Sequence, residues 1–169
     1  MGYYKNLSPN MTYGQAIYSE TARRKGIDNT PTLRQLGVME YLATNLHEPL
    51  CEHFGVRIFN SSFFRSILLN KEVGGVYGSD HTVIEDTAAI DYDMDHMELE
   101  TGVTNRDVFF FIYDNLDYYK LIWEFGNKRK PAWVHVSFST DPKKNAKRQT
   151  IVATRRTGRT TYEPFKDLR

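Results

Sequence analysis

The feature that most constrains the fold is a run of apolar side chains at helical spacing in the first third of the chain. Its members lie three or four positions apart, so one face of a helix carries them all: Leu33, Leu36, Met39, Leu42, Leu46 and Leu50. Pro49 lacks a backbone donor, and we expect it to kink this helix or divide it in two before Gly55 ends the pattern. Such a stripe requires a core to pack against.

Two further helices are indicated by their first turns. Thr12 with Gln15 fits a capping box and predicts a helix over 12–24, which Gly26 would end. Thr104 with Asp107 predicts another helix over 104–119. A shorter helix is expected over 63–73.

Strands are predicted mainly in the second half. The expected strands are 56–61, 88–93, 121–125 and 133–139. The loop GNKRKPA joins the last two and favours a hairpin. Helices first and strands later indicate an α+β fold, with a small antiparallel sheet packed against helices.

Composition excludes several classes of protein. With 169 residues, 40% apolar and 25% charged, the chain suits one soluble folded domain rather than a disordered protein. A net charge of +1 argues against bulk attraction to nucleic acid, and no apolar run approaches the length of a membrane span. The N-terminus MGYYKNLSPN has no apolar core, so we expect no signal peptide.

The basic residues gather after Asp141. We expect residues 1–140 to form the main domain and residues 141–169 a basic C-terminal arm, with one strand near 150–154. Because the arm has few aromatic residues, a protein partner is favoured over nucleic acid.

Three residues form a candidate zinc site. Catalytic zinc takes three protein ligands drawn from histidine and carboxylate and keeps one position open. His81, Asp91 and His135 supply such a set. Spacing alone does not select them, because acids are plentiful and a lone histidine on a strand is more often structural.

Motifs in the same region are more specific. The stretches FNSSFFRSILLNKEVGGVYGSDH, AAIDYD and IWEFGNKRKPAWVHVSF, with the earlier PLCEHFG, follow one another in the chain. In their order and spacing they resemble the M15-type zinc peptidases, which are similar to D-alanyl-D-alanine carboxypeptidases, and in particular the small bacteriophage forms. The resemblance covers roughly residues 12–139 and implies the hedgehog or D-Ala-D-Ala peptidase fold.

The resemblance also implies roles for particular residues. His81, Asp91 and His135 would bind Zn²⁺, and Glu124 would be the general base. Arg65 would bind a substrate carboxylate or stabilise the oxyanion, and Ser79 would support its loop or contact substrate. The alternatives are a hairpin ion pair between Glu124 and Lys128 or Arg129, and a surface ion pair for Arg65.

Other polar residues near the motifs have weaker assignments. Asp93 would share a strand face with Asp91, and could orient a ligand or be the carboxylate ligand itself. Asp80, Asp86 and Asp95 are expected to be solvated charges. The three histidines outside the motifs are expected in helices or on the surface: His47, His53 and His96.

The sequence departs from the family pattern at two points. His81 and Asp91 are ten positions apart, whereas the family separation is seven, and Phe63 stands where the family has glycine. We expect the extra residues to form a bulge or longer loop before the strand, leaving Asp91 in place. Phe63 would reshape or partly fill the cleft.

Two functions follow from these observations. The first is a zinc metallopeptidase that hydrolyses peptide bonds in peptidoglycan stem peptides, of a phage lysis or wall-remodelling type. It would stay in the host cytoplasm until released to the cell wall, or travel with the virus particle. The second is a virion structural protein that retains the peptidase fold and uses its basic arm to bind a neighbouring subunit.

Overall fold

The computed structural model describes residues 6–167 and 169. Its helices are α1 (Tyr13–Ile17), α2 (Glu20–Lys25), α3 (Leu33–Leu42), α4 (Glu48–Phe54), α5 (Ile67–Glu72), α6 (Glu98–Thr101), α7 (Asn105–Asn115) and α8 (Pro142–Asn145), with a π-helical turn η1 (Ala43–His47) and a 3-10 turn η2 (Asp80–Thr82). Its strands are β1 (Asn6–Ser8), β2 (Met11–Thr12), β3 (Asn60–Ser62), β4 (Thr87–Tyr92), β5 (Lys120–Glu124), β6 (Trp133–Ser139), β7 (Gln149–Arg156) and β8 (Arg159–Pro164).

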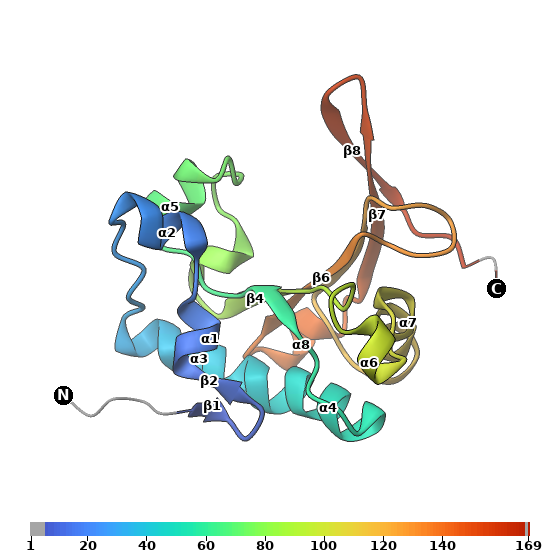
Figure 1. Ribbon diagram of the computed structural model, residues 1–169, viewed down its shortest axis with the longest axis horizontal. Helices are drawn as coiled ribbons and strands as arrows, with labels where there is room; N and C mark the ends of the chain where they lie inside the picture. The colour runs from blue at the N-terminus through green and yellow to red at the C-terminus, as the bar shows by residue number, and fades with distance from the viewer. Residues whose placement is uncertain (1–5, 168) are drawn as a thin grey trace.

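A six-stranded sheet organises the molecule (Figure 1), and β1 and β2 form a separate two-stranded sheet. The order in the large sheet is β3-β4-β6-β5-β7-β8. Neighbouring strands are antiparallel except β5 and β7, which are parallel. The predicted mixture of helices and sheet is confirmed; the sheet is larger than the small antiparallel sheet that was predicted, and it contains one parallel pair.

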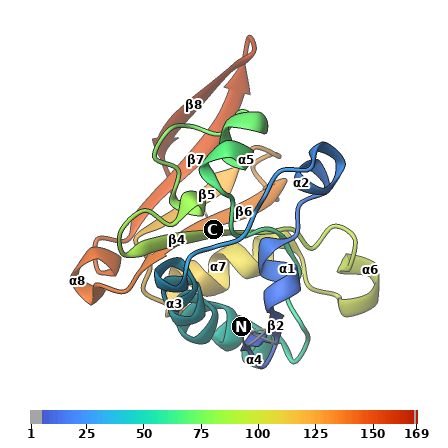
Figure 2. The same cartoon turned by 90° about the vertical axis from the view of Figure 1, so that its left-hand side faces the viewer.

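The strands separate two environments by the alternation of their side chains. Ile90, Leu121 and Val136 belong to the hydrophobic core. They face the layer of α3 and α7, which packs against β4, β5 and β6 (Figure 2). Asp91 and His135 occupy the alternate positions and face away from these helices. The candidate site therefore lies on the face opposite the main helical layer.

The capping boxes predicted at Thr12 and Thr104 are both present. The single helix predicted over 12–24 is instead two helices, because the chain is extended at Tyr18 and Ser19. The Ser19 hydroxyl accepts a hydrogen bond from the Ala22 amide and so begins α2. Gly26 ends that helix in the left-handed conformation, as predicted.

The long apolar stripe spans α3, η1 and α4. Its members from Leu36 to Leu50 are buried, whereas Leu33 is 76% exposed. The helix is not divided, because the residues at both ends of η1 keep right-handed helical angles; it changes to the π-helical turn η1 just before Pro49, which lies in the first turn of α4. No helix in the described ranges combines the length and the apolar character needed to cross a membrane.

The segment after Asp141 is folded into the large sheet rather than extended as an arm. The strand expected over 150–154 lies within β7, whose Ala153 is fully buried beside β5. Tyr118 Oη lies 2.6 Å from Thr150 Oγ1 and ties this strand to the body. The hairpin of β7 and β8 then stands out from the molecule (Figure 1). The domain division at residue 140 stays a prediction.

Candidate metal centre

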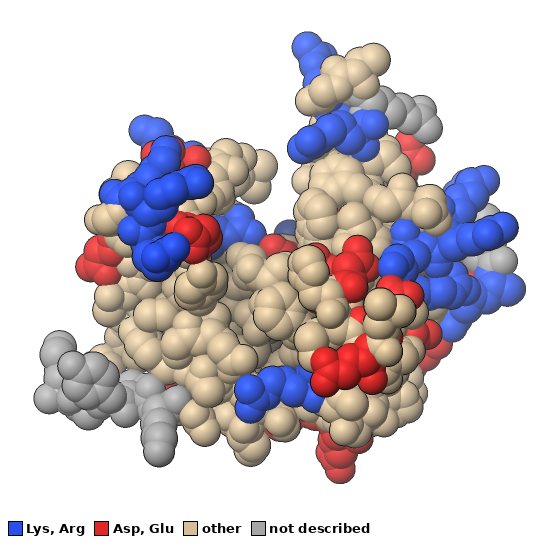
Figure 3. Space-filling view, in the orientation of Figure 1, with Lys and Arg blue, Asp and Glu red and all other residues tan. Residues whose placement is uncertain are grey.

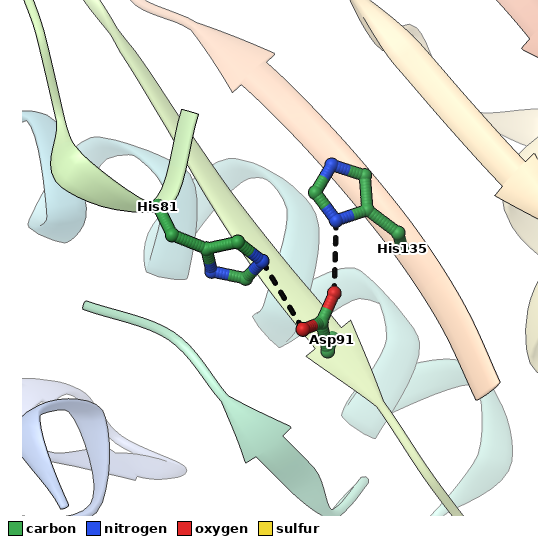
Figure 4. Close-up of side chains that lie close together, drawn as sticks. All are labelled: His81, Asp91 and His135. Atoms are coloured by element: carbon green, nitrogen blue, oxygen red, sulfur yellow. Dashed lines mark hydrogen bonds and ion pairs between the residues drawn. The ribbon is translucent and has the colours of Figure 1, made fainter. Parts of the chain in front are cut away.

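The pairing of β4 with β6 brings two of the predicted ligands together. Asp91 is directly opposite His135 in the register, so both side chains leave the same face of the sheet. His81 arrives from η2, which precedes β4 (Figure 4). One potential ligand atom from each residue lies within 4.8 Å of the other two. The structure thus assembles the three residues that the sequence selected.

The orientation of His81 is fixed by the backbone. Its Nδ1 lies 2.6 Å from the carbonyl oxygen of Phe63 and donates a hydrogen bond to it. Burial lowers the pKa of His81, so the ring is neutral and Nε2 carries a lone pair. This Nε2 is buried without a hydrogen-bond partner, although Asp91 Oδ2 is 3.1 Å away. A nitrogen lone pair and a carboxylate repel each other at this distance. A cation bound between them would turn this arrangement into a favourable one.

His135 presents its other ring nitrogen to the same carboxylate. Its Nδ1 lies 2.8 Å from Asp91 Oδ1, and its Nε2 lies 3.1 Å from Ser137 Oγ. The carboxylate is therefore flanked by a ring nitrogen on each oxygen. Two imidazoles and one carboxylate form a donor set that suits a catalytic zinc ion.

Asp91 is ionised despite its burial. Burial alone would raise its pKa, but the ring nitrogens of His81 and His135, 3.1 Å and 2.8 Å from its oxygens, hold the pKa of this carboxyl far below its usual range. Arg65 Nη2 also donates a hydrogen bond to Asp91 Oδ2 at 3.0 Å. Asp91 consequently carries a negative charge, which the guanidinium of Arg65 partly balances.

Arg65 lies just before α5 and reaches this centre. Its Nε donates to Ser62 Oγ at 3.0 Å, and its guanidinium pairs with Asp91 rather than with an acid on the helix surface. It also lines a cavity of about 420 Å³ together with Tyr18 and Glu20. Its predicted action on substrate stays a prediction, whereas the alternative surface ion pair is wrong.

Glu124 shares the face of the candidate ligands. It ends β5 two positions after Ile122, which is opposite His135. Burial raises the pKa of Glu124, and the negative charge of Asp91 adds to this effect. Among the described residues, Glu124 forms no ion pair with Lys128 or Arg129. Its role as a base stays a prediction.

Ser79 and Asp93 differ in how they relate to the centre. The carbonyl of Ser79 accepts hydrogen bonds from the Thr82 amide and hydroxyl and so supports η2. Asp93 lies beyond the end of β4, where Oδ1 accepts from the Asp95 amide and the Asn105 side chain. The assignment of Asp93 as a ligand or as a partner of one is therefore wrong.

The glycines before His81 shape the loop that carries it. Asn70 is buried, and its Nδ2 donates to the carbonyl of Val76 at 2.9 Å. A Cβ added at Gly75 would lie 2.2 Å from Asn70 Oδ1. The asparagine before Val-Gly-Gly therefore needs a glycine beside it to hold this loop close.

The extra residues between His81 and Asp91 lie before the strand, as expected. Residues 83–86 form a loop in which Val83 and Glu85 adopt positive φ angles of 50° and 61°. β4 then begins at Thr87 and places Asp91 opposite His135. The expectation for Phe63 is wrong, because its side chain packs in the hydrophobic core.

Sequence reasoning misjudged Asp80, which was expected to be solvated. Its Oδ2 accepts a hydrogen bond from Ser137 Oγ at 2.6 Å and an ion pair from Lys120 Nζ at 3.0 Å. The only signals in the sequence were its position beside His81 and the placement of Ser137 two residues after His135. His47 lies in η1, His53 lies in α4, and both His53 and His96 are exposed, as expected.

The surface above the centre is hollowed. Figure 3 shows a depression between the lobe that holds α2 and α5 and the hairpin of β7 and β8. In the same orientation β4 and β6 cross the base of this depression (Figure 1). An extended substrate would therefore have walls on both sides.

Comparison with known proteins gives one match. The model of the family described as Peptidase M15 matches residues 9–109. No curated protein and no solved structure matches the chain. The matched range contains His81 and Asp91, whereas His135 lies beyond it and reaches the centre through the pairing of β6 with β4.

Proposed function

This chain belongs to the peptidase M15 family, and from that premise we propose that it is a zinc metallopeptidase that hydrolyses peptide bonds in peptidoglycan stem peptides. The observation that carries the proposal is the convergence of two imidazole nitrogens on the Asp91 carboxylate, one of them buried and without a hydrogen-bond partner. More specifically, we propose a lysis or wall-remodelling enzyme of phage type, with the hedgehog or D-Ala-D-Ala peptidase fold.

The zinc ligands in this proposal are His81, Asp91 and His135. One nitrogen of each imidazole already has a partner, the Phe63 carbonyl or the Ser137 hydroxyl, so Nε2 of His81 and Nδ1 of His135 would be the nitrogens that hold zinc. Zinc supplies Lewis acidity, which polarises the scissile carbonyl and makes a water molecule acidic.

Glu124 takes the proton of the attacking water in this mechanism. A carboxylate whose pKa is raised by burial is a stronger base than one in solvent. The same carboxyl then returns the proton to the leaving amine. Because Glu124 lies on the face of Asp91 and His135, it can act beside the metal without binding it.

Arg65 and Ser79 would act on the substrate. The Arg65 guanidinium borders both the centre and the neighbouring cavity, which suits a substrate carboxylate or the oxyanion formed by attack of water. Ser79 would contact the peptide from the loop before η2. The depression between the two walls suits a peptide that is trimmed at its terminal D-alanine or cut within the stem.

A second candidate function has one observation in its favour. All six residues of β8 are exposed, and this strand forms an edge of the large sheet. Edge strands pair readily with other chains. A structural subunit of a virus particle could bind its neighbour there, with the peptidase fold as a scaffold and no need for zinc.

Zinc content separates the two candidates. We expect about one zinc per chain in protein purified without chelator, because the donor set provides one three-ligand site. His81→Ala and His135→Ala should each abolish zinc uptake and peptidoglycan hydrolysis, whereas the matched control His53→Ala, on the exposed side of α4, should change neither. Folded wild-type protein that refuses added zinc would exclude the peptidase and leave the structural subunit.

A further inference from the structure

Asp80 is the best-connected acid near the centre outside the predicted set. Only 19% of its side chain is exposed, and Oδ2 contacts both Ser137 and Lys120. It precedes His81 in η2, so one short turn supplies a candidate ligand and an acid that reaches the neighbouring strands. Ser137 is fully buried on β6, on the same face as His135.

The direction of the protons along this path follows from donor chemistry. A carboxylate paired with lysine has no proton to donate, so the hydroxyl of Ser137 is the donor in the 2.6 Å contact with Asp80. The Ser137 oxygen is then free to accept from Nε2 of His135, 3.1 Å away. His135 accordingly carries a proton on Nε2.

A proton on Nε2 of His135 determines the state of the other ring nitrogen, Nδ1. With the Nε2 proton committed to Ser137, a neutral ring has its lone pair on Nδ1, which lies 2.8 Å from Asp91 Oδ1. In each histidine one ring nitrogen is held by a hydrogen bond and the other faces Asp91, but the partner that holds the ring differs. His81 is held by a backbone carbonyl, which no substitution removes, whereas His135 depends on two side chains.

We propose that Asp80 is a positioning residue for the metal, which acts through Ser137 to hold His135 with Nδ1 directed at the ion. This inference rests on the proposed function, because it assumes that the centre binds zinc. Lys120 in turn holds Asp80 by an ion pair at 3.0 Å. Partners of metal-bound histidines that fix the ring in this way are worth roughly 10-fold to 100-fold in metal affinity.

The test compares the zinc affinity of matched variants by competition with a chromophoric chelator. Asp80→Ala should weaken zinc binding about 10-fold to 100-fold. Asp80→Asn, whose amide oxygen still accepts from Ser137, should restore part of the loss. The control is Asp86→Ala, since Asp86 also pairs with a lysine, Lys144, but does not contact a candidate ligand. Circular dichroism would verify folding, and Ser137→Ala replaces Asp80→Ala if that variant does not fold.

A second measurement identifies the path. In the double variant Asp80→Ala with Ser137→Ala, the loss should not exceed that of the larger single loss, because both residues act through one hydrogen bond. Histidine ¹⁵N shifts of the zinc form should show a proton on Nε2 of His135 in the wild type, and a broadened or shifted signal in Asp80→Ala.

The outcomes distinguish this inference from the proposed function. If the wild type binds zinc and His135→Ala does not, but Asp80→Ala binds as tightly as Asp86→Ala, the role of Asp80 is overturned and the zinc site stands. If the wild type takes up no zinc, the proposed function and the role of Asp80 fall together.

Discussion

The two faces of β4, β5 and β6 place different demands on neighbouring residues. On one face Ile90, Leu121 and Val136 pack into the core beneath the helices. On the other, Asp91 and Glu124 are buried as well, and the carboxylate of Asp91 faces a ring nitrogen of His135. Burial on the first face stabilises the fold, whereas burial on the second alters the chemistry of the groups that it encloses.

Adjacent residues of one strand therefore serve different purposes: those on the core face stabilise the fold, and those on the opposite face form the candidate site. Because side chains alternate, a substitution on either face should leave the other face largely intact. Substitutions on the two faces should therefore affect activity and stability separately.

Glu124→Gln should lower the rate of peptide hydrolysis about 100-fold to 10,000-fold, because the amide cannot accept the proton of the attacking water. Zinc content should not change, and the free energy of unfolding should change by less than about 1 kcal/mol, since the side chains are nearly isosteric. Hydrolysis of purified peptidoglycan and urea unfolding would measure the two effects. The exposed Glu100→Gln is the control, and full activity in Glu124→Gln would remove Glu124 from the mechanism.

Leu121→Ala, on the same strand but the opposite face, should give the reverse result. Leu121 is fully buried, so its truncation should lower the free energy of unfolding by about 2–5 kcal/mol. Zinc per folded chain should remain at the wild-type level at low temperature. Urea unfolding measures the first quantity and elemental analysis the second. A stable variant that loses zinc would show that the two faces are coupled.

His47 is a titratable residue that is fully buried on the core side, where Tyr92 Oη lies 3.3 Å from its Nδ1. It therefore tests how burial in the core affects stability. Burial lowers the pKa of His47 to about 4 from its ordinary value of 6.5. The unfolded chain therefore binds a proton below pH 6.5 that the native ring resists until pH 4. This difference should remove about 3 kcal/mol of stability between those pH values, and none above pH 6.5.

The measurement is urea unfolding of the wild type, His47→Gln and His53→Gln at several pH values. His47→Gln should lose this part of the acid dependence, and the exposed His53→Gln should retain it. Equal slopes in all three proteins would show that His47 is protonated as easily in the native state as in the unfolded chain.

Thr104→Ala should have the smallest effect, a loss of about 1 kcal/mol in the free energy of unfolding, because it removes the cap of α7. α7 belongs to the layer on the core face, so peptide hydrolysis per folded molecule should be unchanged. Thermal unfolding beside an activity assay measures both. A large loss of activity without a loss of stability would contradict the separation of the two faces.

The elements determined by local signals were predictable from the sequence. The capping threonines and the left-handed glycine after α2 each depend on neighbours in the chain. The three candidate ligands were selectable because short motifs surround them, although their assembly requires the pairing of Asp91 with His135.

What local signals cannot specify is the choice of tertiary partners. Nothing in the periodicity of 149–156 indicates that β7 lies parallel to β5 rather than leaving the body. All six residues of β4 are buried, including those on the face that points away from the core helices. The reason is that distant groups such as Arg65 and His81 cover Asp91 from above.

The opposition of Asp91 and His135 also determines where this chain can tolerate insertions and deletions. Residues 83–86 form a loop, so a change of length there leaves the later pairing in place. A single residue added between Trp133 and Val134 would instead turn the imidazole toward the core helices and leave a valine in its place. The loop can therefore change in length during evolution, whereas the strand cannot gain or lose one residue without moving its side chains to the opposite face of the sheet.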